Sequence, residues 1–122
     1  MTQKFYRYGL LIVMTLVTIL FLIKIGGPIP KTPAHTDKVV HCVIFFGLTW
    51  LVFRAISKPK WILITSLAVY GAVIEVIQGL FPYRSASLLD FVADLAGIGL
   101  FLILAAIVTQ FRRFRNTSSE ES

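Results

Sequence analysis

The chain has 122 residues, of which 57% are hydrophobic and only 15% are charged, with a mean hydropathy of +0.81. A small water-soluble domain cannot bury so large an apolar fraction in one core, because its surface is a large share of its volume. The single cysteine excludes an internal disulfide framework. The formal charge of +6 does not indicate a nucleic-acid-binding protein, since the basic residues flank apolar segments and form no patch of their own.

Four apolar segments that carry few charges follow one another along the chain, at residues 8–25, 37–56, 61–80 and 88–111. Each is near the ~20 residues that an α-helix needs to cross a hydrocarbon core of ~30 Å. Helices are favoured over a β-barrel because the runs do not alternate in polarity. The first run is too long for a signal peptide, and no small-residue cleavage site follows it before Pro28. The sequence therefore predicts an all-α membrane protein, a four-transmembrane-helix bundle.

The connections between the segments predict the topology. The link at residues 57–60 is so short that the second and third helices must form an antiparallel hairpin, whereas the link at 26–36 is rich in glycine and proline and predicts an extended outer loop. We expect one transmembrane domain at residues 1–115 and a disordered cytoplasmic tail at 116–122.

The distribution of lysine and arginine predicts the orientation. Two lie at the N-terminus, three around the second connection and three after the fourth segment, which makes eight on one side against four on the other. The positive-inside rule then places both termini in the cytoplasm. We expect a multi-pass membrane protein.

Ionisable residues inside three of the segments are the chemically informative feature, because each costs several kcal/mol in a membrane or needs a partner. With a rise of about 1.5 Å per residue, His41, Glu75 and Asp94 lie roughly 20–27 Å from the cytoplasmic ends of their helices. They therefore share one outer layer, and we select them as candidate catalytic residues. The candidate ligand-binding residues lie on the same helix faces or beside them: Asp37, Lys38, Gln78, Arg84, Ser87 and Asp90.

Several of the flanking residues also have a structural explanation. Asp37 could cap the second helix, and Ser87 with Asp90 matches a capping box for the fourth. Lys38 could extend its ammonium group to the membrane interface. His41, Glu75 and Asp94 are harder to explain in this way, because they lie inside their helices.

The polar residues occur in four short motifs, at residues 36–41 (TDKVVH), 75–78 (EVIQ), 84–90 (RSASLLD) and 93–97 (ADLAG). Together they resemble the VanZ-like family, whose pattern is D-K-x-x-H, E-x-x-Q, R-S-x-S-x-x-D and N-x-x-G over the last three of four helices. The resemblance covers about residues 37–100 and implies a small bacterial membrane protein. The family is named for a teicoplanin-resistance accessory protein, which supplies a phenotype and no mechanism. Asp94 departs from the pattern, because the family commonly has asparagine there.

The outward-facing layer suggests a site that binds or processes a lipid-linked or cell-envelope polar head group. Arg84 could clamp a phosphate or carboxylate, and Glu75 or His41 could act as general base. Enzymatic activity stays open because no nucleophile motif is recognisable.

A non-catalytic packing or partner module, whose polar layer fixes helix register, is the alternative. A proton or ion pathway is disfavoured, since the cytoplasmic halves of the helices are almost purely apolar. The expected partner is a membrane lipid, not nucleic acid; a homo-oligomer or a membrane partner protein remains open.

The charges of this layer do not balance. Asp37, Glu75, Asp90 and Asp94 oppose only Lys38 and Arg84. Two like charges 4 Å apart cost about 4 kcal/mol even at an effective dielectric constant near 20. The layer is therefore expected to take up a proton or a cation. We expect no resident metal or cofactor, because protonation of Glu75 or His41 is the simplest relief; a divalent metal at Asp37-x-x-x-His41 is the alternative.

Overall fold

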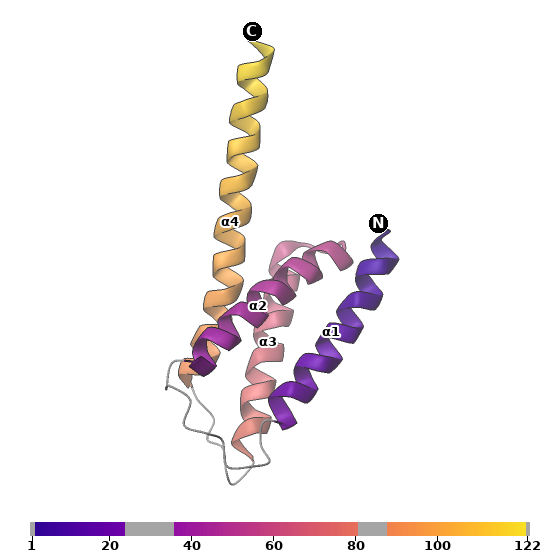
Figure 1. The fold of residues 1–122 in the computed structure, drawn as a ribbon, viewed down its shortest axis with the longest axis vertical. Helices are drawn as coiled ribbons and strands as arrows, with labels where there is room; N and C mark the ends of the chain where they lie inside the picture. The colour runs from indigo at the N-terminus through magenta and orange to yellow at the C-terminus, as the bar shows by residue number, and fades with distance from the viewer. Residues whose placement is uncertain (1, 24–35, 81–87, 122) are drawn as a thin grey trace.

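The computed structural model describes residues 2–23, 36–80 and 88–121, and within them the chain is helical with short connecting turns. The elements are α1 (Gln3–Ile23), α2 (Thr36–Ala55), α3 (Lys60–Gly79) and α4 (Leu88–Glu120) (Figure 1). Each of these helices is long and apolar enough to cross a membrane. The predicted all-α class and the four membrane-length helices are therefore confirmed.

Two side-chain hydrogen bonds fasten the start of α1 to the turn between α2 and α3. Gln3 Nε2 donates to Ser57 Oγ at 2.6 Å, and Arg7 Nε donates to the carbonyl of Ala55 at 3.0 Å. Ala55 ends α2, so Arg7 satisfies one of the carbonyls that lack a partner within the helix. The start of α1 and the α2–α3 turn thus lie at one end of the bundle (Figure 1).

The helices are arranged around α2, which makes its most extensive contacts with α4 and then with α1. Within the described residues, α1 and α4 do not touch each other, because α2 and α3 separate them. The buried apolar residues come from all four helices: Leu10, Val17, Phe21, Phe45, Leu48, Val52, Ala55, Leu63, Leu67, Ile74 and Ile98. Many other large apolar side chains, such as Leu16, Trp61 and Ile107, point outward. An exterior of this kind is compatible with a lipid environment.

Glycines allow the closest helix contacts. A Cβ atom at Gly97 of α4 would overlap the backbone carbonyl of Cys42 on α2 and lie 3.0 Å from the backbone nitrogen of Phe46. A Cβ atom at Gly71 of α3 would lie 3.0 Å from Asp94 Oδ2 and 3.2 Å from Phe45 Cζ. Small residues at such positions let membrane helices pack backbone to backbone.

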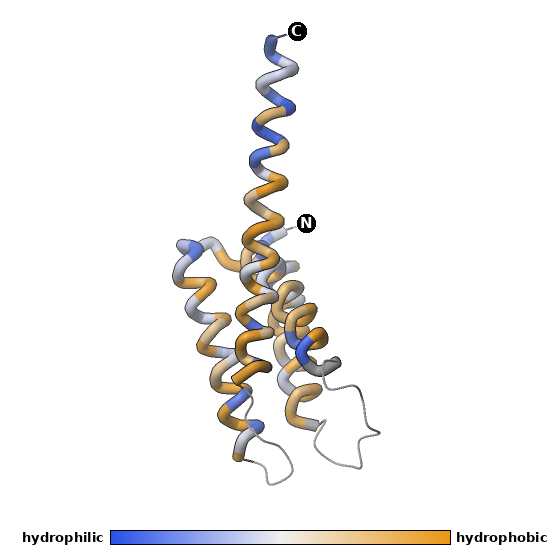
Figure 2. The backbone as a smooth tube through the Cα atoms, turned by 90° about the vertical axis from the view of Figure 1, so that its left-hand side faces the viewer, coloured by the Kyte–Doolittle hydropathy of each residue, from blue (hydrophilic) through white to orange (hydrophobic). Residues whose placement is uncertain are grey.

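The fourth helix is longer than the sequence predicts. It runs to Glu120, whereas the sequence predicts an end at residue 111 and a disordered tail from 116. No glycine or proline lies after Gly99 to stop the helix. Hydroxyl groups of Thr117, Ser118 and Ser119 also bond to the carbonyls four residues earlier. At 33 residues, α4 is about 50 Å long and projects beyond the other helices, with a hydrophilic end (Figures 1 and 2).

The first helix also begins earlier than predicted, at Gln3 instead of residue 8. The prediction followed hydropathy, which falls at Lys4 and Arg7, but a membrane helix can continue through charged residues where it leaves the apolar core. α2 and α3 begin and end within one residue of the predicted bounds.

Candidate functional site

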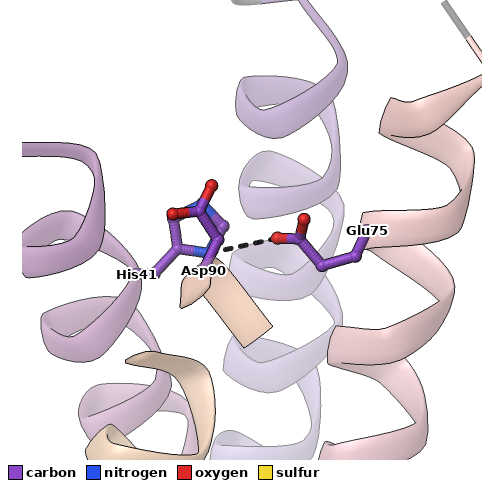
Figure 3. A group of neighbouring side chains, drawn as sticks. All are labelled: His41, Glu75 and Asp90. Carbon is purple, nitrogen blue, oxygen red and sulfur yellow. Dashed lines mark ion pairs between the residues drawn. The ribbon is translucent and has the colours of Figure 1, made fainter. Parts of the chain in front are cut away.

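His41 is the centre of the polar cluster. Its Nδ1 lies 2.7 Å from Asp94 Oδ1 on α4 and 3.8 Å from Glu75 Oε1 on α3. Its ring stacks on Phe21 of α1, with ring centroids 4.6 Å apart and planes inclined by 19°. All four helices therefore meet at this one side chain. Figure 3 shows His41 of α2 with two of its neighbouring carboxylates, Glu75 of α3 and Asp90 of α4.

The His41–Asp94 pair is almost completely shielded. The exposed fraction is 4% for His41 and 0% for Asp94. When Asp94 is ionised, its carboxylate can only accept hydrogen bonds, and Nδ1 of the imidazole then donates to Oδ1. This bond selects the tautomer and the ring orientation, and it leaves Nε2 as the nitrogen for further chemistry.

The second oxygen of Asp94 lies in an unusual environment. Oδ2 is buried and accepts no hydrogen bond from any residue that the structure describes. It faces the backbone of Gly71, where only a residue without a side chain leaves it room. A buried acceptor without a donor costs about 1–3 kcal/mol, so Asp94 is held at this position at an energetic cost.

Asp90 and Lys38 lie at the edge of the cluster. Lys38 Nζ is 3.7 Å from Asp90 Oδ1, and both side chains are partly exposed. Asp90 lies one helical turn before Asp94, so both carboxylates project from the same face of α4. The ligand atoms of His41, Glu75 and Asp90 all lie within 4.8 Å of one another, which is close enough to hold a metal ion.

The predicted site residues fall into three groups. His41, Glu75, Asp90 and Asp94 come together, with Lys38 on Asp90. Gln78 is buried but turns toward α1, where its Nε2 donates to the carbonyl of Phe21 at 3.0 Å. Arg84 and Ser87 lie outside the part of the chain that the structure describes, and so does the side chain of Asp37.

Sequence reasoning missed the contribution of α1. Phe21 stacks on His41, and Thr18 Oγ1 shares a 2.7 Å hydrogen bond with the hydroxyl of Tyr70 on α3. Phe21 lies within an apolar run, so the sequence alone does not distinguish it from a phenylalanine that faces lipid. Only the docking of α1 against α2 and α3 distinguishes the two.

Two cavities lie away from the polar cluster. One of about 700 Å³ lies between the upper half of α4 and the α2–α3 turn, and Phe53, Lys60 and Arg113 are among the residues that line it. Another of about 200 Å³ lies among α1, α2 and α3 beside Met14 and Tyr70. Neither is lined by His41, Glu75 or Asp94, so neither belongs to the polar cluster.

Comparison of the chain with protein-family models, with curated proteins and with solved structures finds no match. The VanZ-like resemblance therefore rests on the motif residues alone.

Proposed function

We propose that the chain is a multi-pass protein of the bacterial cytoplasmic membrane, with both termini in the cytoplasm, and that it belongs to the VanZ-like family. The apolar exterior of the four helices supports the membrane location. The eight-to-four distribution of basic residues supports the orientation. His41 and the residues around it come from all four family-like motifs, which supports the family assignment.

The orientation predicts which positions are accessible from outside the cell. On a Cys42→Ala background, Lys58→Cys in the exposed α2–α3 turn should react with a membrane-impermeant maleimide only after the cells are permeabilised. Leu80→Cys, at the exposed opposite end of α3, should react in intact cells. Labelling of Lys58→Cys in intact cells would reverse the proposed orientation.

The cluster around His41 binds the polar head group of a membrane lipid or of a lipid-linked cell-envelope precursor in this proposal. The observation that carries it is the buried His41–Asp94 pair with Glu75 beside it, about 20 Å along α2 from Arg54. Buried ionisable groups inside a membrane bundle are expensive, so they mark a functional site by default. With both termini in the cytoplasm, as proposed, the distance of these groups from the cytoplasmic helix ends corresponds to the outer leaflet.

The geometry favours binding and proton transfer over covalent catalysis. With Nδ1 held by Asp94, Nε2 of His41 can exchange a proton with a hydroxyl or phosphate group. Glu75 supplies a second proton carrier 3.8 Å from Nδ1. Among the described residues, no serine, threonine or cysteine side chain hydrogen-bonds to His41, as an activated nucleophile would.

A module that only fixes helix register is the second candidate. The Gln78 bond to the backbone of α1 and the Thr18–Tyr70 pair favour it, because both are polar contacts with a purely structural effect. Polar contacts between membrane helices specify which faces meet, even where each contributes only about 0.6 kcal/mol.

Lipid binding discriminates between the two candidates. Native mass spectrometry of the detergent-purified protein would use polyprenyl phosphate and phosphatidylglycerol as probes. His41→Gln should weaken binding of at least one probe about 10- to 100-fold, since a hydrogen bond to a charged group is worth about 1.5–3 kcal/mol. Glu120→Gln, an exposed carboxylate far along α4, is the matched control and should bind as the unmodified protein does. Equal binding of both probes by His41→Gln, with folding intact, would favour the register module.

A further inference from the structure

We propose that His41, Glu75 and Asp90 bind a divalent transition-metal ion, and that Asp94 is the positioning residue that orients His41 toward it. The metal site itself stands on the geometry of the cluster. Its use in head-group recognition rests on the proposed function.

The donor set is the first argument. One imidazole and two carboxylates from three different helices bring their ligand atoms within 4.8 Å of one another. Metal–ligand bonds of about 2.0–2.2 Å put two ligand atoms at most about 4.4 Å apart, and about 3.4 Å apart in a tetrahedral site, so the three side chains need to approach one another slightly to hold an ion. Three protein ligands with a remaining open position are the arrangement of catalytic zinc sites, and nitrogen–oxygen donor sets also suit manganese.

The His41–Asp94 pair is the second argument. A histidine that binds a metal through one nitrogen almost always donates its other N–H to a carboxylate or a carbonyl. Asp94 Oδ1 occupies that position at 2.7 Å from Nδ1. Nε2 is then the nitrogen left to bind the metal, and Asp94 acts through His41 without binding the ion.

The environment of Asp94 is the third and independent argument. Its Oδ2 is fully buried and accepts no hydrogen bond from the described residues, so the carboxylate's own surroundings do not compensate its charge completely. A divalent cation on the other side of His41 would draw electron density from the imidazole, which makes its N–H a stronger donor to Asp94. The cation thereby helps to stabilise a buried carboxylate that is otherwise costly.

The charge of the site supports the same ion. The described part of the cluster contains the carboxylates of Glu75, Asp90 and Asp94 and the single ammonium group of Lys38. A phosphate-bearing head group would be repelled by this excess of negative charge. A divalent ion held by His41, Glu75 and Asp90 would attract the phosphate instead, since its open coordination position accepts a phosphate oxygen. The metal therefore defines the ligand class as an anionic, phosphate-bearing head group.

Metal analysis tests the site directly. Protein purified without chelator or polyhistidine tag should retain about one equivalent of zinc or manganese per chain by mass spectrometry of the elements. After metal removal, Co²⁺ should bind and give visible d–d absorption bands. His41→Gln, Glu75→Gln and Asp90→Asn should each abolish stoichiometric binding. Asp94→Asn should weaken it about 10- to 100-fold, as removal of an outer-shell carboxylate does. Glu120→Gln should bind as the unmodified chain.

The outcomes separate the metal site from the proposed function. A folded protein that binds none of Zn²⁺, Mn²⁺ and Co²⁺ would overturn the metal site. An infrared band of a protonated carboxylic acid at neutral pH, lost in Glu75→Gln, would then identify a proton in place of the metal. If that metal-free protein still binds the phosphate-bearing probes, the proposed function stands without the ion. If the protein binds metal but neither probe, the metal site stands and head-group binding is refuted.

Discussion

Substitution of Gly97 by alanine is expected to push α4 away from α2 and to destabilise the bundle by about 3 kcal/mol or more. Overpacking a core with one extra carbon costs about 1–3 kcal/mol when side chains can adjust. At Gly97 the added Cβ would meet backbone atoms of Cys42 and Phe46, which cannot rotate away. The two helices must separate instead, and α2 and α4 form the largest helix pair of the bundle.

Gly99→Ala is the matched control for this substitution. It lies two residues further along α4, and a Cβ there would meet no atom within 4 Å. Alanine is the better helix former by about 1 kcal/mol, so Gly99→Ala should be neutral or slightly stabilising. Denaturation in detergent, followed by the fluorescence of Trp50 and Trp61, compares the two variants. Equal midpoints would contradict the close contact between α2 and α4.

Removal of the Asp94 carboxylate has the second large expected effect. Asp94→Ala leaves Nδ1 of a buried His41 without its hydrogen-bond partner, and an unsatisfied buried donor costs about 1–3 kcal/mol, or more when the group is charged. Asp94→Asn should cost much less, because its amide oxygen can still accept the bond from Nδ1. The same unfolding measurement ranks the three proteins.

The double variant His41→Leu with Asp94→Ala shows whether this cost comes from the pair. When both partners become apolar, neither leaves an unsatisfied buried group, so stability should recover by at least about 1 kcal/mol relative to Asp94→Ala alone. Leucine can also retain the apolar contact with Phe21. The absence of any recovery would show that Asp94 stabilises the fold through contacts other than His41.

The double variant also separates the two candidate functions. A register module needs only correct packing, so a stable double variant should retain its function. A head-group or metal site needs the imidazole itself, so the double variant should be folded and inactive. Compared with Asp94→Ala, the double variant should be more stable in either case. It should lose binding only if the cluster is a functional site.

The helices of this protein could be predicted from the sequence because membrane segments must be long, apolar and internally hydrogen-bonded. The bounds of α2 and α3 were accessible for the same reason, since charged or turn-forming residues border them closely. The ends of α1 and α4 were not, because hydropathy marks where the apolar layer ends and not where the helix does. α4 continues through Arg112 and Arg113 because no residue breaks it.

The depth of the polar residues was also determined by the sequence alone. A constant helical rise puts His41, Glu75 and Asp94 in one layer whatever the helices do around one another. Equal depth, however, does not specify which side chains touch. The tertiary structure pairs His41 with Asp94 and turns Gln78 toward α1, although the sequence places Gln78 one turn from Glu75 on the same face.

The choice of partners depends on the rotation and spacing of the helices, which the sequence pattern does not encode residue by residue. Gly97 sets the spacing of α2 and α4 through backbone contact, and Gly71 leaves the space that Asp94 Oδ2 occupies. Phe21 joins the site only because α1 docks beside α2 and α3. The sequence by itself thus determined four membrane-length apolar helices with one polar layer, because both follow from local composition and helix geometry. Only the tertiary structure decided that His41 is the centre of that layer, because this depends on close packing between distant segments.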